Sequence, residues 1–189
     1  MKILKSQFLF ALIASLVFVS GCNDDDNEEV SPFVGNYVIS NAAVSESFTV
    51  ITNIGDIPVD VDTDITPAIQ NALLGSVTCS SADKSWVELR DGGKLAMSCE
   101  GANELDAGTW EEVSDTELKL NMNSAAIPTS PTGYSLSVTN IAAAGSNLSG
   151  NTSVPLPKEM VAAMIAPLTL ADGNPDIFIV KFSIQFSKQ

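Results

Sequence analysis

Thiols and carboxylates are the side chains of this 189-residue chain that could do chemistry, because the chain contains no histidine. The commonest general base, the commonest metal ligand and every imidazole-based triad are therefore excluded. Three cysteines, Cys22, Cys79 and Cys99, remain together with 23 acidic residues. The spacing of these groups decides which chemistry the sequence can support.

Cys22 ends a segment with the features of an export signal over 1–21. Lys2 and Lys5 precede an apolar run over 8–19, and small residues stand just before Cys22. The run is shorter than the about 20 residues of a membrane-spanning helix, so we expect cleavage before Cys22. The segment resembles the lipobox of bacterial lipoproteins, which implies that Cys22 carries a diacylglycerol thioether and an acylated N-terminus, with fatty acids such as palmitate. An ordinary secretory signal cut nearby is the alternative.

Cys79 and Cys99 form an even pair in an exported chain, and such a pair forms a disulfide by default. Two buried free thiols are the alternative interpretation. A metal site made of cysteine alone would need more ligands than these two. We therefore expect a disulfide and no cofactor.

Two groups of carboxylates have spacings known from functional sites, but neither is complete. Asp60, Asp62 and Asp64 alternate as in calcium loops, yet Ile65 stands where such a loop needs glycine and no glutamate closes it. The carboxylates that could supply the acid and base of a glycosidase are Glu100, Glu104, Asp106, Glu111 and Glu112. Neighbouring residues on a strand face opposite sides, and carboxylates of so acidic a chain mostly lie on the surface. We therefore expect no metal site and no enzyme.

The charge balance excludes some partners. Residues 1–21 contain two lysines and no acidic residue, so the remaining 168 residues carry 7 basic and 23 acidic side chains, a formal net charge of −16. Such a surface repels the phosphates of nucleic acid and offers no basic patch to a membrane. We expect a monomer that contacts the membrane through its lipid anchor.

Residues 22–32 have almost no apolar side chain to bury, which predicts a disordered acidic tether. Ten residues could reach about 30 to 35 Å when extended. The acidic run after Cys22 resembles the export signals of Bacteroidota-type lipoproteins, which implies the outer face of the outer membrane. A plain solvated spacer is the alternative. The length of 33–189 fits one domain.

From residue 33 onward the two-residue period of β-strands dominates. Two hairpins are predicted, one over 86–99 around Asp91-Gly92-Gly93 and one over 108–122 around Ser114-Asp115. Further strands are predicted over 35–40, 46–54, 76–80, 133–141, 146–152 and 176–187. Apolar residues on one face and polar residues on the other are typical of an antiparallel sheet around one core.

Two short helices interrupt the strands. Thr66 can cap the first and Gly75 can end it. The second is predicted over 157–166. Thr52-Asn53-Ile54 and Thr139-Asn140-Ile141 each stand before one helix, which indicates either a degenerate duplication or chance.

Several of these motifs resemble a family. Phe33-Val-Gly-Asn-Tyr37 resembles the opening motif of lipocalin-like barrels, with Tyr37 where tryptophan is usual. The block from Cys79 through Gly108-Thr109-Trp110 to Leu118 is similar to the lipocalin-like domains of bacterial lipoproteins, in which two cysteines bracket a hairpin and a Gly-Thr-Trp strand follows. The insert over 54–66 is longer than in compact members. The resemblance implies an all-β fold, a lipocalin-like antiparallel β-barrel with two short helices.

A barrel of about eight strands has room for packed side chains or for one small ligand. The resemblance implies binding of a small or apolar molecule without catalysis. The residues expected to line its pocket are Phe48, Val50, Leu95, Met97, Trp110, Leu118, Leu120, Phe182 and Ile184. We expect the helix over 157–166 to act as a lid, with the flexible Met160 and Met164 adapting to the ligand. The alternative is a surface interaction module with a filled β core that contacts glycan or protein through loops such as 123–131.

Overall fold

The structure, a computed structural model, describes residues 30–74, 76–77, 79–123 and 133–189. One compact unit covers Ser31–Gln189, close to the predicted domain of 33–189. The predicted signal segment, Cys22, the predicted tether up to residue 29 and most of the loop over 123–131 lie outside the described residues.

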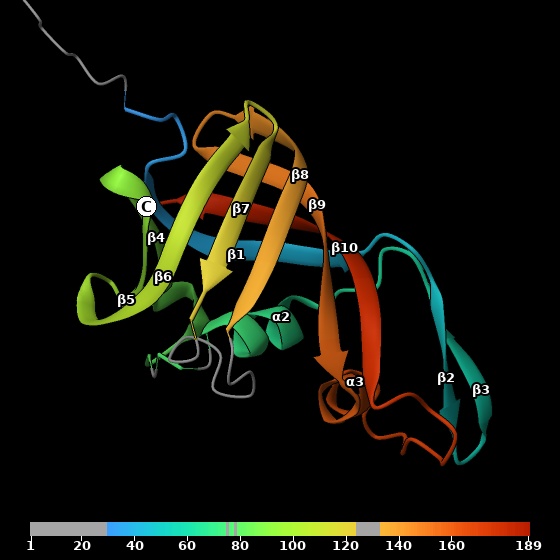
Figure 1. Cartoon of the computed structure of the whole chain (residues 1–189). Helices are drawn as coiled ribbons and strands as arrows, with labels where there is room; N and C mark the ends of the chain where they lie inside the picture. The colour runs from blue at the N-terminus through green and yellow to red at the C-terminus, as the bar shows by residue number, and fades with distance from the viewer. Residues whose placement is uncertain (1–29, 75, 78, 124–132) are drawn as a thin grey trace, which may run out of the picture. The chain divides into compact units, whose positions relative to one another are not determined.

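Eight antiparallel strands close into a barrel (Figure 1). They are β1 (Gly35–Val44), β4 (Ser85–Arg90), β5 (Lys94–Cys99), β6 (Ala102–Ser114), β7 (Glu117–Met122), β8 (Tyr134–Ala144), β9 (Asn147–Pro157) and β10 (Ile177–Lys188). The strands follow one another around the barrel in this order, and β10 pairs with β1 to close it. The predicted all-β fold, an antiparallel barrel with two short helices, is confirmed.

The two-residue period of β10 shows how the wall of the barrel forms. Phe182, Ile184 and Phe186 are buried, whereas Lys181 and Gln185 between them are exposed. Burying one such apolar side chain contributes roughly 1.5–3 kcal/mol relative to leaving it exposed. The alternation therefore fixes which face of the strand points inward.

The chain between β1 and β4 forms a hairpin and a helix. β2 (Phe48–Thr52) and β3 (Gly55–Val59) pair with each other, and α2 (Thr66–Leu74) follows. The Thr66 hydroxyl, predicted as the helix cap, bonds to the strand instead: it accepts a hydrogen bond of 2.8 Å from the Ala42 backbone N–H. This bond fixes the start of α2 to the end of β1. The 3₁₀ turns η1 (Ala82–Lys84) and η2 (Asp91–Gly93) flank β4.

β9 and β10 continue together beyond the point where β8 and β9 are paired. β9 pairs with β10 along its full length, but its pairing with β8 ends at Asn151. The extension carries α3 (Lys158–Met164), whose Val161 is buried, and it packs against the β2–β3 hairpin through Phe48 and Phe178, whose ring centroids are 5.9 Å apart. A second part of the hydrophobic core forms there.

Some predicted elements differ from the structure. The described residues of 76–80 form turns and not a strand, because the chain must turn there between α2 and β4. β3 was not predicted, since Asp56 and Pro58 interrupt its apolar alternation. Thr52-Asn53-Ile54 lies at the β2–β3 turn whereas Thr139-Asn140-Ile141 lies inside β8, so the two motifs do not occupy equivalent positions.

Candidate functional site

Cys79 and Cys99 form the predicted disulfide, with Cα atoms 5.6 Å apart. This separation lies within the usual range for bonded cysteines. Cys79 precedes η1 and Cys99 ends β5, so the bond ties the chain that leaves α2 to the barrel wall. Neither sulfur is then a thiolate that could act as a nucleophile or a metal ligand.

The residues predicted to line a ligand pocket are mostly core residues. Phe48 is partly buried, and eight of the nine are buried in one hydrophobic cluster, namely Val50, Leu95, Met97, Trp110, Leu118, Leu120, Phe182 and Ile184. Of the nine, Leu118 and Leu120 line a cavity inside the barrel, whereas the other seven do not. Phe48 and Val50 were wrongly placed in the barrel wall, because β2 pairs with β3 in a two-stranded sheet outside the barrel. For the other seven residues the strand pattern was enough to predict an inward-facing side chain, but not whether that side chain meets space or another side chain.

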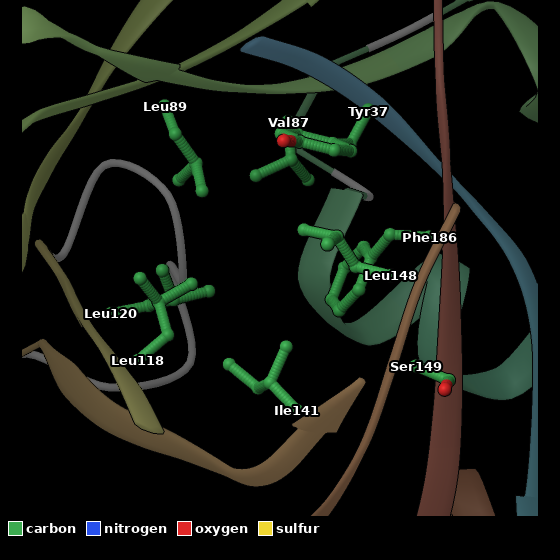
Figure 2. A pocket seen from close by; sticks show the side chains of 9 residues that line it. All are labelled: Tyr37, Val87, Leu89, Leu118, Leu120, Ile141, Leu148, Ser149 and Phe186. Atoms are coloured by element: carbon green, nitrogen blue, oxygen red, sulfur yellow. The ribbon is translucent and has the colours of Figure 1, made fainter. Parts of the chain in front are cut away.

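The cavity inside the barrel has a volume of about 20 Å³. Leu118, Leu120 and Ile141 face Leu148 and Phe186 across it (Figure 2). The other lining residues are Tyr37, Val87, Leu89 and Ser149. One water needs roughly 10–15 Å³ of such space, and ligand pockets usually measure about 300–1,000 Å³. The cavity therefore has room for about one or two waters.

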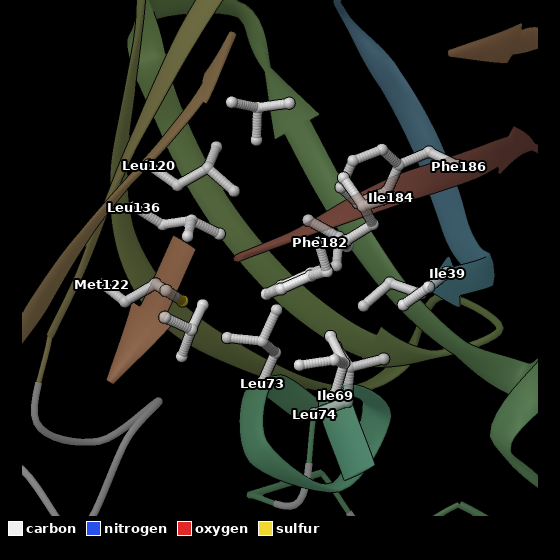
Figure 3. Packing of buried hydrophobic residues seen from close by; sticks show 14 of the residues in the cluster. Ile39, Ile69, Leu73, Leu74, Leu120, Met122, Leu136, Phe182, Ile184 and Phe186 are labelled. Carbon is white, nitrogen blue, oxygen red and sulfur yellow. The ribbon is translucent and has the colours of Figure 1, made fainter. Parts of the chain in front are cut away.

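Side chains of α2 help to fill the barrel. Ile69, Leu73 and Leu74 are buried, and they project from the helix toward Phe182 (Figure 3). Gln70 fixes the helix in place, because its Nε2 donates a hydrogen bond of 2.9 Å to the backbone oxygen of Ile39. The apolar edge of α2 was visible in the sequence, but its packing partner was not.

α3 does not lie over the cavity. The cavity is lined by Tyr37 near the start of β1, Leu148 near the start of β9 and Phe186 near the end of β10. α3 joins the end of β9 to the start of β10, at the opposite ends of these strands. The expected role of α3 as a lid over a barrel pocket is therefore wrong for this cavity.

A groove of about 280 Å³ lies between α2 and α3. Its lining residues are Asp64, Ile65, Pro67, Ala68, Asn71, Met160, Ala163 and Met164. Met160 and Met164, which we expected at a barrel pocket, thus line an outer groove. Sequence reasoning identified the two methionines but not α2 as the opposite wall.

Asp64 gives this groove a negative charge. Its Oδ1 accepts a hydrogen bond of 2.9 Å from the Thr66 backbone N–H. Hydrogen bonds from Thr66 hold the pKa of Asp64 below its ordinary value, so the carboxylate is ionised at neutral pH. Asp60 and Asp62, in the turn that leads to Asp64, are exposed. In the part of the chain that the structure describes, no three His, Cys, Asp or Glu side chains are grouped so that they could hold a metal ion.

The carboxylates considered for acid–base catalysis lie apart from the groove and the cavity. Both oxygens of Glu104 accept hydrogen bonds from the Arg90 guanidinium, at 2.8 and 2.9 Å, and these bonds lower the pKa of Glu104. Arg90 also binds the carboxylate of Glu88, which is buried and accepts a hydrogen bond from Ser98. The groove and the cavity are lined by none of the five carboxylates, Glu100, Glu104, Asp106, Glu111 and Glu112. The buried Glu88 had no distinguishing signal in the sequence.

None of the helices among the described residues is long and apolar enough to cross a membrane. Comparisons with protein-family models, curated proteins and solved structures gave no match. The lipocalin-like resemblance therefore stays a prediction from the sequence, and a function must be argued from the geometry.

Proposed function

We propose that this protein is a lipid-anchored outer-membrane lipoprotein whose barrel is a non-enzymatic interaction module that binds a partner on its outer surface. The observation that carries the proposal is the small size of the cavity lined by Leu118, Leu120 and Phe186 inside the barrel, about 20 Å³. A fatty acid inside the barrel would have to displace packed side chains, and overpacking a core costs about 1–3 kcal/mol or more. A larger space, of about 280 Å³, lies on the outer surface between α2 and α3.

The lipobox at Cys22 and the acidic tether that follows it support the anchoring part of the proposal. A tether of this length lets the barrel stand about 30 to 35 Å from the membrane when the tether is extended. The resemblance to Bacteroidota-type export signals supports the outer membrane as its location. The acidic surface is compatible with attachment through acyl chains alone.

A small apolar ligand inside the barrel is the second candidate. It is favoured by the lining of the internal cavity, in which Ser149 and the Tyr37 hydroxyl are the polar side-chain groups among nine residues. Apolar cavities stay dry and bind apolar molecules when they are large enough. Here Leu118 and Leu120 would have to move aside first.

Methionine and leucine methyl groups can distinguish the two candidates. The chain has five methionines, of which Met1 belongs to the signal segment. Met97 and Met122 are buried in the barrel, whereas Met160 and Met164 line the outer groove. The mature chain carrying Cys22→Ala, labelled at the methionine and leucine methyls, is titrated with laurate and with a fluorescent fatty-acid analogue. We expect the resonances of Leu118 and Leu120, which line the cavity, to stay in place, as should those of Met97 and Met122. A saturable shift of any of these four would sink the proposal in favour of the internal ligand.

A further inference from the structure

We propose that the groove between α2 and α3 is the docking site of a partner protein, and that it takes one large apolar side chain from a segment that also carries a basic residue. The inference rests on the proposed function, and it adds the site and the chemistry of the partner. It is argued from the size of the groove, from its walls and from its charge.

The size of the groove suits a side chain better than a complete ligand. Its volume of about 280 Å³ lies just below the range of about 300–1,000 Å³ that holds drug-sized molecules. Pockets that receive one buried anchor residue carry much of the binding energy of protein interfaces. A phenylalanine or leucine side chain with its flanking backbone would fill a groove of this size.

The walls of the groove are apolar except at Asp64 and Asn71, and they are adaptable. Ala68 on α2 and Ala163 on α3 leave the space open, because their side chains end at Cβ. Met160 and Met164 have flexible thioether side chains that can repack around a guest. Burying roughly 100–150 Å² of apolar surface would give about 2.5–4 kcal/mol at 25 cal/mol/Å² before association costs, so one anchor alone binds weakly.

The negative charge of the groove is the reason to expect a basic residue in the partner segment. Asp64 lines the groove, and Asp60 and Asp62 are exposed in the same turn. Lys158, the basic residue of α3, is not among the lining residues, and Glu159 stands beside it in the sequence. A groove with this rim repels anionic molecules such as fatty acids and favours a segment with a lysine or arginine. The carboxylates then set specificity while the apolar side chain supplies the contact area.

Three short peptides test the inference on the mature chain carrying Cys22→Ala. The first has one phenylalanine between two lysines, the second has the same phenylalanine between two glutamates, and the third has alanine between two lysines. We expect the first peptide to shift the methyl resonances of Met160 and Met164 saturably while Met97 and Met122 stay in place. Its affinity should be at least about tenfold higher than that of either control peptide.

Two variants assign the effect to the groove. Ala163→Phe should fill it and weaken the first peptide at least tenfold, and because Ala163 is exposed the change should leave the fold intact. Asp64→Asn keeps the Oδ1 acceptor for the Thr66 N–H but removes the charge, so it should weaken binding about threefold to tenfold. The matched controls Ala143→Phe and Asp115→Asn, at exposed positions on β8 and in the β6–β7 turn, should leave the affinity unchanged. If Ala163→Phe does not fold, the affinity of Asp64→Asn for the first peptide decides whether the groove is the binding site.

The outcomes separate the inference from the proposed function. Saturable binding that leaves Met160 and Met164 unshifted would overturn the groove as the site, while the module would still bind on its outer surface. Equal affinity for the lysine and glutamate peptides, or binding of none of the three, would overturn the partner chemistry. Shifts at Met97 or Met122 would contradict the proposed function itself.

Discussion

Lys188, near the end of the last strand, lies over the ring of Tyr37. Its Nζ lies 5.9 Å from the centre of the Tyr37 ring and donates a hydrogen bond of 2.8 Å to the backbone oxygen of Val34. Gly35 makes room for this side chain, because a Cβ there would lie 2.5 Å from Lys188 Cε. The glycine and the aromatic residue of the first sequence motif thus act together with a residue at the far end of the chain.

Gly108 is the residue at which a side chain should be least tolerated. Its φ is +130°, and a Cβ there would lie 2.1 Å from the backbone oxygen of Asn121. We expect Gly108→Ala to lower the free energy of unfolding by about 2 kcal/mol or more, measured by urea denaturation. Gly145→Ala is the control, because Gly145 also has a positive φ but open space around it, and it should cost about 1 kcal/mol. Equal costs for both variants would contradict the close approach.

Arg90 sets the pH range over which Glu104 stays ionised. Its hydrogen bonds hold the pKa of Glu104 below the ordinary value of 4.5. A pKa that is lower in the folded state means that the pair stabilises the fold above about pH 4.5 and that this contribution is lost as the pH falls through the lowered pKa. In Arg90→Gln, a carboxyl NMR titration should show the pKa of Glu104 returning toward 4.5. The lowered pKa of Asp64, which depends on Thr66, should not change in the same spectra.

At the scale of elements, prolines occupy strand edges that stay unpaired although the barrel is closed. Pro155 and Pro157 lie in the part of β9 beyond its described pairing with β8, and Pro58 lies in β3. Proline has no N–H to offer to another strand, so it makes such edges poor templates for aggregation.

α2 should stabilise the barrel as part of its core. We expect Leu73→Ala, which removes a buried side chain of α2, to lower the free energy of unfolding by about 2–5 kcal/mol. Asn71→Ala on the exposed side of the same helix should change it by less than about 0.5 kcal/mol. Urea denaturation of both variants checks the difference. A cost below about 1 kcal/mol for Leu73→Ala would mean that α2 is not part of the cooperative core.

The disulfide should contribute a large share of the stability. Cys79 and Cys99 are 20 residues apart, and closing a loop of that length is worth roughly 3 kcal/mol in the chain-entropy model. Typical domains have only about 5–15 kcal/mol in total. Reduction should therefore lower the urea midpoint of the native chain and leave that of the double variant Cys79→Ala, Cys99→Ala unchanged. Peptide mapping that finds two free thiols in exported protein would refute the bond.

At the scale of the whole molecule, attachment to the membrane should depend on one residue. Because residues 22–189 have a formal net charge of −16, their surface should not hold the protein on an anionic membrane once the lipid is missing. We expect Cys22→Ala to release soluble protein, measured by fractionation of cells. Mass spectrometry of the native N-terminus provides the direct check, and an unmodified Cys22 would rule the anchor out.

The sequence by itself determined what depends on local patterns. Alternation along 176–187 was enough to place Phe182 and Ile184 on the inner face, and Asp91-Gly92-Gly93 was enough to place the first hairpin. The pairing of Cys79 with Cys99 followed from the prediction that the third cysteine, Cys22, carries a lipid. The alternation and the turn depend only on neighbouring residues, and the cysteine pairing leaves no other thiol as a partner.

Only the tertiary structure decided whether the inner face surrounds a ligand or a core. Leu120 and Phe182 have the same inward parity, yet Leu120 borders the small cavity and Phe182 packs near α2. That outcome depends on how much volume a helix from a distant segment brings into the barrel, and no strand pattern carries this information. The same reason explains the methionines of α3: their stripe was visible in the sequence, but the wall they face comes from α2, roughly 90 residues earlier in the chain.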